Sequence, residues 1–244
     1  MKKFLKIILT LVMIVSLAAC GGKKEEEKKV IYVGTNAEFP PFEYLEEGEI
    51  TGFDMELIKE IAKEAELEIK IEDMSFDGLL PALQSKKVDV VIAGMTANEE
   101  RKKAVNFTTP YYTASQVIVV KEGDDSINSF DDLKGKKVGV MLGFTGDLVV
   151  SEIAGVNIER YNAAYAGIMA LQSGKVDAVV LDSEPAKNYV EKNEGLAIAK
   201  ADAAEEEYAI AVRKEDEELL EKLENGLKTV KDNGTYEELL KKYF

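Results

Sequence analysis

The sequence has no histidine and only one cysteine, Cys20, among its 244 residues. Without histidine it cannot form a Ser-His-Asp triad, a Cys-His pair or a Cys/His zinc cluster. A single cysteine excludes an intramolecular disulfide. The sequence also lacks the P-loop consensus that binds nucleotide phosphates. These absences remove many common catalytic devices, and we expect neither a cofactor nor a bound metal.

Positive charge is also in short supply. Lysine and arginine number 31 against 46 aspartates and glutamates, which gives a formal net charge of −15. A chain this acidic is repelled by phosphate backbones and by anionic lipid surfaces. The composition therefore argues against a nucleic-acid partner and against membrane adhesion by charge.

The first twenty residues have the order of a bacterial lipoprotein signal. A basic start, MKKFLK, precedes an apolar run, IILTLVMIVSL, that is short for a membrane span, and LAAC follows. We predict that residues 1–19 are removed and that Cys20 is lipidated. A plain secretory signal with a chance cysteine is the alternative. Residues 1–19 carry three lysines and no acid, so their removal changes the net charge from −15 to −18.

Residues 20–29 form the next segment, in which mostly charged residues follow the cysteine that is predicted to be lipidated. Its sequence GGKKEEEKK lacks apolar residues and is typical of a short solvated tether. Two or more acyl chains suffice for stable anchoring. We therefore expect an extracytoplasmic protein in the cell envelope, lipid-anchored to a membrane, in a periplasm or at the cell surface.

One sequence unit occurs twice in the remaining chain. Residues 82–94 read ALQSKKVDVVIAG, and residues 170–182 read ALQSGKVDAVVLD, with eight of thirteen positions identical at an offset of 88. Each copy predicts a helix end, a turn and a strand buried in a parallel sheet. Ligands of open α/β sheets bind beyond the carboxyl ends of such strands. A duplicated fold without a surviving site is the alternative.

From residue 30 onward, predicted strands and helices alternate, which is typical of an α/β protein. Two apolar strands, Gln116–Val120 and Tyr208–Val212, flank the second copy and are predicted to cross between two lobes. We assign residues 30–117 and 209–244 to lobe 1 and residues 118–208 to lobe 2. One continuous sheet without a hinge is the alternative.

The lobes are expected to repeat the order strand, helix, strand, helix, strand. The expected strands span residues 30–34, 67–71, 88–93, 138–142, 157–161 and 176–181. The expected helices span residues 56–65, 76–84, 147–153, 164–172, 217–232 and 236–243.

Arg101 is the strongest single candidate for binding a ligand. Asn98 is a plausible N-cap, which places Arg101 in the first turn of a helix behind two glutamates. A cation there opposes the helix dipole, whereas a bound carboxylate would meet free N–H groups and a guanidinium together. A surface arginine neutralised by its acidic neighbours is the alternative.

Asp182 ends the second copy at the position where Gly94 ends the first. Two similar lobes that offer a cation and an anion suit a zwitterion held between them. The local alternative for Asp182 is a cap on a helix that begins near Ser183.

Three aromatic residues, Phe39, Phe76 and Phe144, fall in turns or helix starts at the predicted cleft. Their rings could sandwich a ligand side chain and exclude water. Ordinary core packing is the alternative, and we expect it for Phe42. The turn at residues 143–146 adds backbone donors and the Thr145 hydroxyl near a helix start.

Seven collinear stretches resemble the family 3 solute-binding proteins of polar amino acid ABC transporters, from about Val30 to Phe244. They are VGTNAEFPPFEY, GEITGFDMELIKEIAKE, SFDGLLPALQSKKVDVVIAGM, TANEERKKAVNFTTPYY, GKKVGVMLGFTG, VDAVVLD and NGTYEELLKKYF. The resemblance implies the two-lobed type II periplasmic-binding-protein fold, with two crossing hinge strands and a cleft that closes on the ligand.

The resemblance also implies a role for each candidate residue. Arg101 would bind the ligand α-carboxylate, and Asp182 the α-amine. The ligand backbone would further contact Gly94, Thr96 and Thr145, and its side chain would face Asn36, Phe39 and Phe76. Asn36 stands where many members carry aspartate, which weakens the case for a cationic ligand. Ala97-Asn98 replaces a commoner hydroxyl-rich pair.

We therefore expect a monomeric receptor, without catalysis, that delivers a polar L-amino acid to the membrane permease of an ABC transporter. Arginine and lysine are slightly favoured over glutamine and other neutral amino acids, because the aromatic faces suit a cation and Glu38 could supply a counter-charge. Two alternatives stay open, an enzyme similar to cyclohexadienyl dehydratase on the same fold and the sensor domain of a signalling system.

Overall fold

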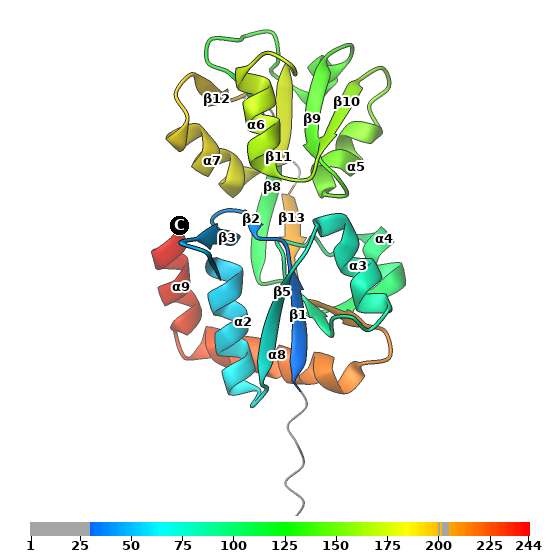
Figure 1. Ribbon diagram of the computed structural model, residues 1–244, viewed down its shortest axis with the longest axis vertical. Coiled ribbons are helices and arrows are strands. Elements are labelled where there is room, and N and C mark those ends of the chain that lie inside the picture. Colours follow the sequence, from blue (N-terminus) through cyan, green and yellow to red (C-terminus); the bar gives the residue numbers. More distant parts are fainter. Residues whose placement is uncertain (1–29, 200, 202–204) are drawn as a thin grey trace, which may run out of the picture.

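The computed structural model describes residues 30–199, 201 and 205–244, which form two α/β lobes joined by crossing strands (Figure 1). The predicted signal peptide, Cys20 and the whole predicted tether lie outside the described residues. Within the described part of the chain, no helix is both long enough and apolar enough to span a bilayer. The mixed α/β class expected from the sequence is confirmed.

Lobe 1 is built on a five-stranded sheet in the order β5-β1-β6-β14-β7. β1 pairs in parallel with β5 and β6, whereas β14 runs antiparallel to β6 and β7. The strands are β1 (Ile31–Thr35), β5 (Ile69–Asp73), β6 (Val90–Val91), β7 (Val105–Phe107) and β14 (Ala211–Arg213). The helices are α2 (Phe53–Glu64), α3 (Phe76–Gln84), α4 (Glu99–Ala104), α8 (Glu217–Asp232) and α9 (Thr235–Tyr243).

A small antiparallel sheet extends lobe 1 where the two lobes meet (Figure 1). It consists of β2 (Glu38–Phe39), β3 (Glu43–Glu46) and β4 (Glu49–Thr51). Phe39 lies opposite Glu43 in this sheet. This pairing places Glu43 next to Phe39, which is predicted to face the ligand side chain. In the sequence, Glu43 lies between two aromatic residues.

Lobe 2 is built on strands in the order β10-β9-β11-β8-β12, with β9, β10 and β11 parallel. The strands are β8 (Tyr112–Lys121), β9 (Lys137–Met141), β10 (Asn157–Tyr161), β11 (Ala178–Asp182) and β12 (Leu196–Ile198). The helices are the short 3-10 helix η1 (Phe130–Leu133) and the α-helices α5 (Thr145–Ser151), α6 (Ala164–Gln172) and α7 (Ser183–Lys192).

β11 is buried along its whole length, which explains the continuous apolar run of the second copy. Val179 and Leu181 pack into the larger core cluster, whereas Ala178 and Val180 pack into a second cluster. The strand therefore contributes to two cores, one on each face of its sheet, because successive side chains of a strand point to opposite faces.

Two antiparallel strands run between the lobes. β8 pairs with β13 (Glu205–Tyr208) near lobe 1 and with β11 and β12 inside lobe 2. The expected continuous strand Tyr208–Val212 is wrong, because β13 ends at Tyr208 and β14 begins at Ala211. Between them, the N–H of Ala209 donates to the Met95 carbonyl, so the chain leaves β8 and joins the lobe 1 sheet.

Most other expected elements agree with the structure, and the differences have local causes. The helix expected at residues 56–65 begins at Phe53, because the buried Phe53 and Asp54 already lie in its first turn. Of the strand expected at residues 88–93, only Val90–Val91 form a strand in the structure. The exact limits of the two lobes, including the hinge at residues 117/118 and 208/209, stay a prediction.

Candidate ligand site between the lobes

The structure brings seven of the eight predicted site residues together where the lobes meet. The Thr145 hydroxyl of lobe 2 donates to the Thr96 hydroxyl of lobe 1 at 2.9 Å. Arg101 reaches across to the Gly143 carbonyl at 3.0 Å. Phe39, Phe76 and Gly94 make the remaining contacts, and Asp182 joins the group through the neighbouring Glu206, which accepts a hydrogen bond from Thr96.

Arg101 is held as the sequence predicts, by a short helix with a polar cap. The Asn98 side chain accepts a hydrogen bond from the backbone N–H of Arg101 at the start of α4. The guanidinium is 8% exposed and donates to the carbonyls of Thr96 at 2.9 Å and Gly143 at 3.0 Å. Burial lowers its pKa to about 10, so it stays charged at neutral pH. Among the ion pairs of the described residues, none involves Arg101.

Asp182 ends β11 and occupies the N-cap position of α7, yet its side chain makes no capping hydrogen bond. Its carboxyl instead accepts a hydrogen bond from the Tyr208 hydroxyl on β13. Asp182 is 3% exposed, and burial, followed by the neighbouring Glu206, raises its pKa well above the ordinary value. The capping role that local sequence allowed for Asp182 is therefore wrong.

Aromatic rings from both lobes contact one another at the site. Phe76 of α3 and Phe144 of lobe 2 stack with their centroids 3.6 Å apart, and Phe39 lies 5.1 Å from Phe144. The Arg101 guanidinium lies over Phe76, 5.2 Å from the ring centroid. Phe42 packs against Tyr208 and Tyr112, in the core role expected for it.

Gly94 must be a glycine, because a side chain would not fit at this position. Its φ is +51°, and a Cβ atom there would lie 2.8 Å from the Phe39 ring. Its backbone N–H donates to the Asp54 carboxylate at 2.8 Å. Asp54 thus fixes the backbone just beyond β6, where a ligand of lobe 1 would bind.

Asn36 lies apart from this contact group, in the turn that follows β1. It is 4% exposed, and its Nδ2 donates to the Met74 carbonyl at 3.0 Å. Its Oδ1 is buried and has no hydrogen-bond donor within the described part of the protein. Asn36 therefore offers an unpaired acceptor in this turn.

Sequence reasoning missed a group of polar residues that complete the site. Its members are Glu43, Asp54, Gln116, Glu206 and Tyr208, each buried. Glu206 accepts hydrogen bonds from the Thr96 hydroxyl and the Gln116 amide, both at 2.6 Å. A usable signal existed for Glu206, because it lies two positions before Tyr208 and so shares its face of the strand.

Glu43 and Asp54 form a buried acid pair beneath the 36–39 turn. Both are fully buried, and no donor reaches either Glu43 oxygen. Burial raises the pKa of Glu43 well above its ordinary value and that of Asp54 to about 6, with Asp54 a further cause for Glu43. Two contacting carboxyls of this kind are compatible when one of them carries a proton.

The buried charges of the site do not balance. Elsewhere, buried Asp89 pairs with Arg213 at 2.8 Å and buried Asp147 pairs with Arg160 at 2.9 Å. At the site, Glu43, Asp54, Asp182 and Glu206 are buried near a single cation, Arg101, and the described residues form no ion pair with them. No group of three or more carboxylates in the described ranges is arranged to hold a metal ion. The site thus has one positive group and several acceptors for positive ones.

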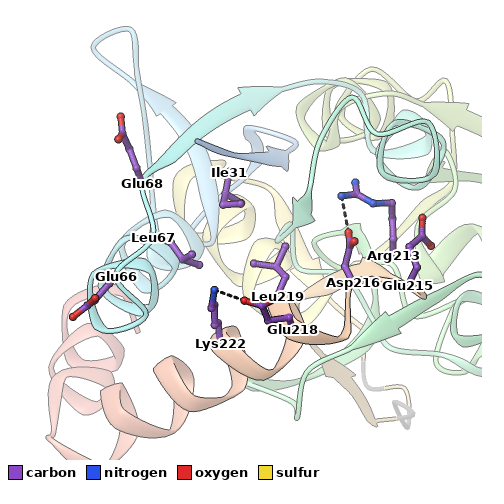
Figure 2. A pocket seen from close by; sticks show the side chains of 10 residues that line it. All are labelled: Ile31, Glu66, Leu67, Glu68, Arg213, Glu215, Asp216, Glu218, Leu219 and Lys222. Carbon is purple, nitrogen blue, oxygen red and sulfur yellow. Dashed lines mark hydrogen bonds and ion pairs between the residues drawn. The ribbon is translucent and has the colours of Figure 1, made fainter. Parts of the chain in front are cut away.

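A separate depression of about 460 Å³ lies at the other end of lobe 1 (Figure 2). It surrounds Ile31, where β1 begins, whereas the candidate site lies beyond the opposite end of β1. Ion pairs within the chain already occupy its cations, Arg213 with Asp216 at 2.6 Å and Lys222 with Glu218 at 2.7 Å (Figure 2). Both of its cations therefore already have an acidic partner within the chain, unlike Arg101 between the lobes.

Comparison with known proteins agrees with this architecture. Residues 31–244 match the family described as bacterial extracellular solute-binding proteins, family 3. The arginine-binding extracellular protein ArtP of Bacillus subtilis is 42% identical, over 100% of this chain and 98% of ArtP.

Solved structures of an ancestral arginine-binding protein, one bound to arginine and one to glutamine, are each 48% identical, with a TM-score of 0.85. The match covers 88% of this chain and 98% and 97% of those two chains. The two lobes, the crossing strands and the family match together place this chain among the bacterial extracellular solute-binding proteins of family 3.

Proposed function

We propose that this protein is a lipid-anchored, extracytoplasmic receptor that binds a basic L-amino acid, arginine or lysine, between its lobes and delivers it to an ABC permease. The observation that carries the proposal is the excess of buried carboxyls at the site, four against one buried guanidinium, because a bound cation favours their charged form. A basic amino acid carries one anionic and two cationic groups, so it complements this arrangement better than a neutral one does.

The backbone of the ligand is assigned to the residues at the strand ends. Arg101 binds the α-carboxylate, because its fork of donors is otherwise satisfied only by two carbonyls. Asp182, which comes from the other lobe, binds the α-amine. Thr96, Thr145 and the Gly94 backbone complete the contacts with this end of the ligand.

The side chain of the ligand is assigned to the turn at residues 36–39 and the aromatic rings. The unpaired Oδ1 of Asn36 accepts an N–H, and the buried Glu43–Asp54 pair supplies carboxyls whose charged form a cationic ligand end would stabilise. Phe39 and Phe76 offer faces on which a guanidinium or ammonium can lie. Glu38 is only half-buried, so water screens its charge more than it screens the fully buried Glu43, and Glu43 is therefore the better partner for a cation.

The relatives support this ligand class without deciding between its members. The similar proteins reported above are named as arginine-binding proteins, and they are binding proteins rather than enzymes. Glutamine is the main competitor, because an arginine-binding relative is also known bound to glutamine. An amide would satisfy the Asn36 acceptor but would leave Glu43 without a cation.

Competitive calorimetry on the purified protein with arginine, lysine, histidine and glutamine tests the ligand class. We expect arginine or lysine to bind most tightly. If glutamine or another neutral amino acid binds more than about tenfold tighter than every basic one, a difference of about 1.4 kcal/mol, the charge argument is wrong.

The anchor is tested separately, by Cys20→Ser. Loss of the lipidation site should move the protein from the membrane fraction to the soluble envelope or culture fraction. Unchanged membrane fractionation of the variant would overturn the proposed lipid anchor while leaving the proposed ligand untouched.

Transport requires the permease to recognise the loaded receptor, and we assign that signal to closure of the lobes, as a monomer, about the crossing strands. Residues 30–117 with 209–244 and residues 118–208 are the proposed rigid units. Small-angle scattering with and without saturating arginine should show a more compact particle when arginine is bound. Identical scattering curves would contradict the hinge.

A further inference from the structure

Glu206 is a buried acid in a run of three glutamates that looks solvated in the sequence. On β13 the burial alternates, so Glu205 and Glu207 are exposed while Glu206 is 7% exposed. Its two oxygens accept from the Thr96 hydroxyl and the Gln116 amide, both at 2.6 Å. Glu206 therefore belongs to the interior of the site rather than to the surface.

The carboxyl of Glu206 lies beside that of Asp182. Gln116 of β8 is the register partner of Asp182 on β11, and Gln116 also donates to Glu206. Glu206 is the largest cause after burial of the raised pKa of Asp182, and the two carboxyls are within hydrogen-bond reach. Two adjacent buried carboxyls cannot both stay ionised unless a cation or a proton lies between them.

The same corner of the site is short of hydrogen-bond donors. The Oε1 atom of Gln116 is buried and has no donor in the described chain, although Gln116 is 2% exposed. Each carboxylate oxygen can accept two hydrogen bonds, and a protonated amine supplies three N–H donors. An unpaired acceptor next to two carboxyls is therefore suited to an ammonium group.

We propose that Glu206 is a second carboxylate of the amine subsite, so that Asp182 and Glu206 together hold the α-amine of the ligand. This inference rests on the proposed function, in which the α-amine binds at Asp182. It makes Glu206 a residue that determines specificity for an amino acid over the same acid without its amine.

Several other groups face this pair and set its charge. Arg101 comes from α4, and Glu206 and Asp182 both stabilise its charged form. Glu43 of β3 interacts with Asp182, and the Tyr208 hydroxyl of β13 donates to Asp182. Arg101 is the only cation in this list, and its carbonyl contacts direct it to the carboxylate end of the ligand.

The test compares two ligands that differ only in the α-amine, L-arginine and 5-guanidinopentanoic acid, by calorimetry on the purified protein. Glu206→Gln keeps the shape of the side chain and removes its charge. We expect this variant to lose roughly 30-fold or more in affinity for arginine but less than about threefold for the analogue. Equal losses for both ligands would mean that Glu206 is structural, and the inference would be wrong.

Glu207→Gln is the matched control, because it removes the same charge from an exposed neighbour on the same strand. It should leave both affinities unchanged. If wild-type protein binds neither ligand, the proposed function fails. A second outcome is that wild type binds arginine while Glu206→Gln shows the same ratio of arginine affinity to analogue affinity as wild type. In that case the proposed function stands and only the role of Glu206 is wrong.

A measurement on wild-type protein covers the case in which Glu206→Gln does not fold. Calorimetry in buffers of different ionisation enthalpy counts the protons released on binding. An ammonium that displaces a proton from Asp182, whose pKa burial and the adjacent Glu206 raise, should release more protons with arginine than with 5-guanidinopentanoic acid near neutral pH. Equal proton release for the two ligands would contradict the paired carboxylates, since the guanidinium end is common to both.

Discussion

In both lobes the repeated unit is bonded to the first strand of the lobe in the same way, but different residues stand at its carboxyl end. In lobe 1 the Asp89 carboxylate accepts from the Tyr32 N–H at 3.1 Å, and in lobe 2 the Asp177 carboxylate accepts from the Lys137 N–H at 2.7 Å. The backbone N–H groups of both aspartates donate back to the same partner residues, each at 2.7 Å. Residues 88 positions apart thus make the same bonds to the first strand of their own lobe.

The surroundings of these two aspartates show how the lobes diverged. Asp89 is buried and pairs with Arg213, which also donates to the Val88 carbonyl at 2.6 Å. Asp177 is exposed. Arg213 ends β14, just before the C-terminal helices of lobe 1. Lobe 1 therefore uses the repeated acid to attach the end of the chain, and lobe 2 does not.

The functional difference lies at the carboxyl ends of the repeated strands. After β6 the chain turns at Gly94, whose backbone is held by Asp54, whereas β11 ends in the Asp182 side chain itself. The repeated scaffold places both strand ends at the same site. The cation of lobe 1, Arg101, follows the repeat, whereas the anion of lobe 2, Asp182, is the last residue of the repeat, where lobe 1 has Gly94.

The largest expected effect comes from removing Arg101 or Asp182, the cation of lobe 1 and the anion of lobe 2. Arg101→Ala and Asp182→Ala should each weaken arginine binding by about 2 to 5 kcal/mol, roughly 30-fold to several thousand-fold, since each removes one member of a buried charged pair with the ligand. Lys102→Ala, at an exposed neighbour of Arg101, is the control. A calorimetric affinity of Arg101→Ala within threefold of wild type would remove Arg101 from the site.

The next comparison separates the two repeated aspartates. Asp89→Asn should lower the free energy of unfolding by about 3 kcal/mol, because it leaves the buried Arg213 with only Asp216 as a charged partner. Asp177→Asn removes an exposed hydrogen bond and should cost about 1 kcal/mol or less. Urea unfolding of both variants measures the difference, and equal losses would show that Arg213 adds nothing to the lobe 1 copy.

A pH comparison contrasts Asp54, a buried acid of lobe 1 that accepts hydrogen bonds from neutral groups, with Asp147, a buried acid of lobe 2 that pairs with Arg160. The pKa of Asp54 is raised from 3.8 to about 6 in the folded protein. The folded state therefore binds more protons between those values, so the free energy of unfolding should fall by roughly 2 to 3 kcal/mol as the pH rises from about 4 to about 6.

Asp54→Asn should flatten this part of the stability curve, measured without ligand by urea unfolding at several pH values. Asp147→Asn is the lobe 2 counterpart, and it removes the partner of Arg160 instead. It should destabilise the protein while leaving the slope between pH 4 and 6 in place. If the free energy of unfolding of Asp54→Asn still falls between pH 4 and 6, other acids cause the slope.

The smallest expected effect lies in the turn of the repeat, where Lys86 and Gly174 occupy equivalent positions with φ of +64° and +73°. A side chain in this left-handed conformation costs about 1 kcal/mol relative to glycine. Lys86→Gly should therefore stabilise lobe 1 slightly, and Gly174→Ala should destabilise lobe 2 by about 1 kcal/mol. Thermal unfolding checks both, and the same sign for both changes would contradict the equivalence of the turns.

The sequence alone determined the features that depend on local pattern. The repeat located the central strand of each lobe, since a buried parallel strand needs a continuous apolar run. The helices at residues 76–84, 164–172 and 217–232 have the bounds that their periodicity predicts. Arg101 was identifiable because a cation in a first helical turn conflicts with the helix dipole, and Asn98 caps that turn as expected.

Tertiary structure alone decided which acids belong to the site. In this acidic chain a glutamate is usually solvated. Only the alternation along a strand could have separated Glu206 from the exposed glutamates beside it, and no local pattern marks Glu43. Burial of Glu206 follows from the antiparallel pairing of β13 with β8, which turns every second side chain inward. The interaction of Asp182 with Glu206 then depends on strands that are far apart in the sequence, because charge burial is a property of what packs around a residue and not of its neighbours in the chain.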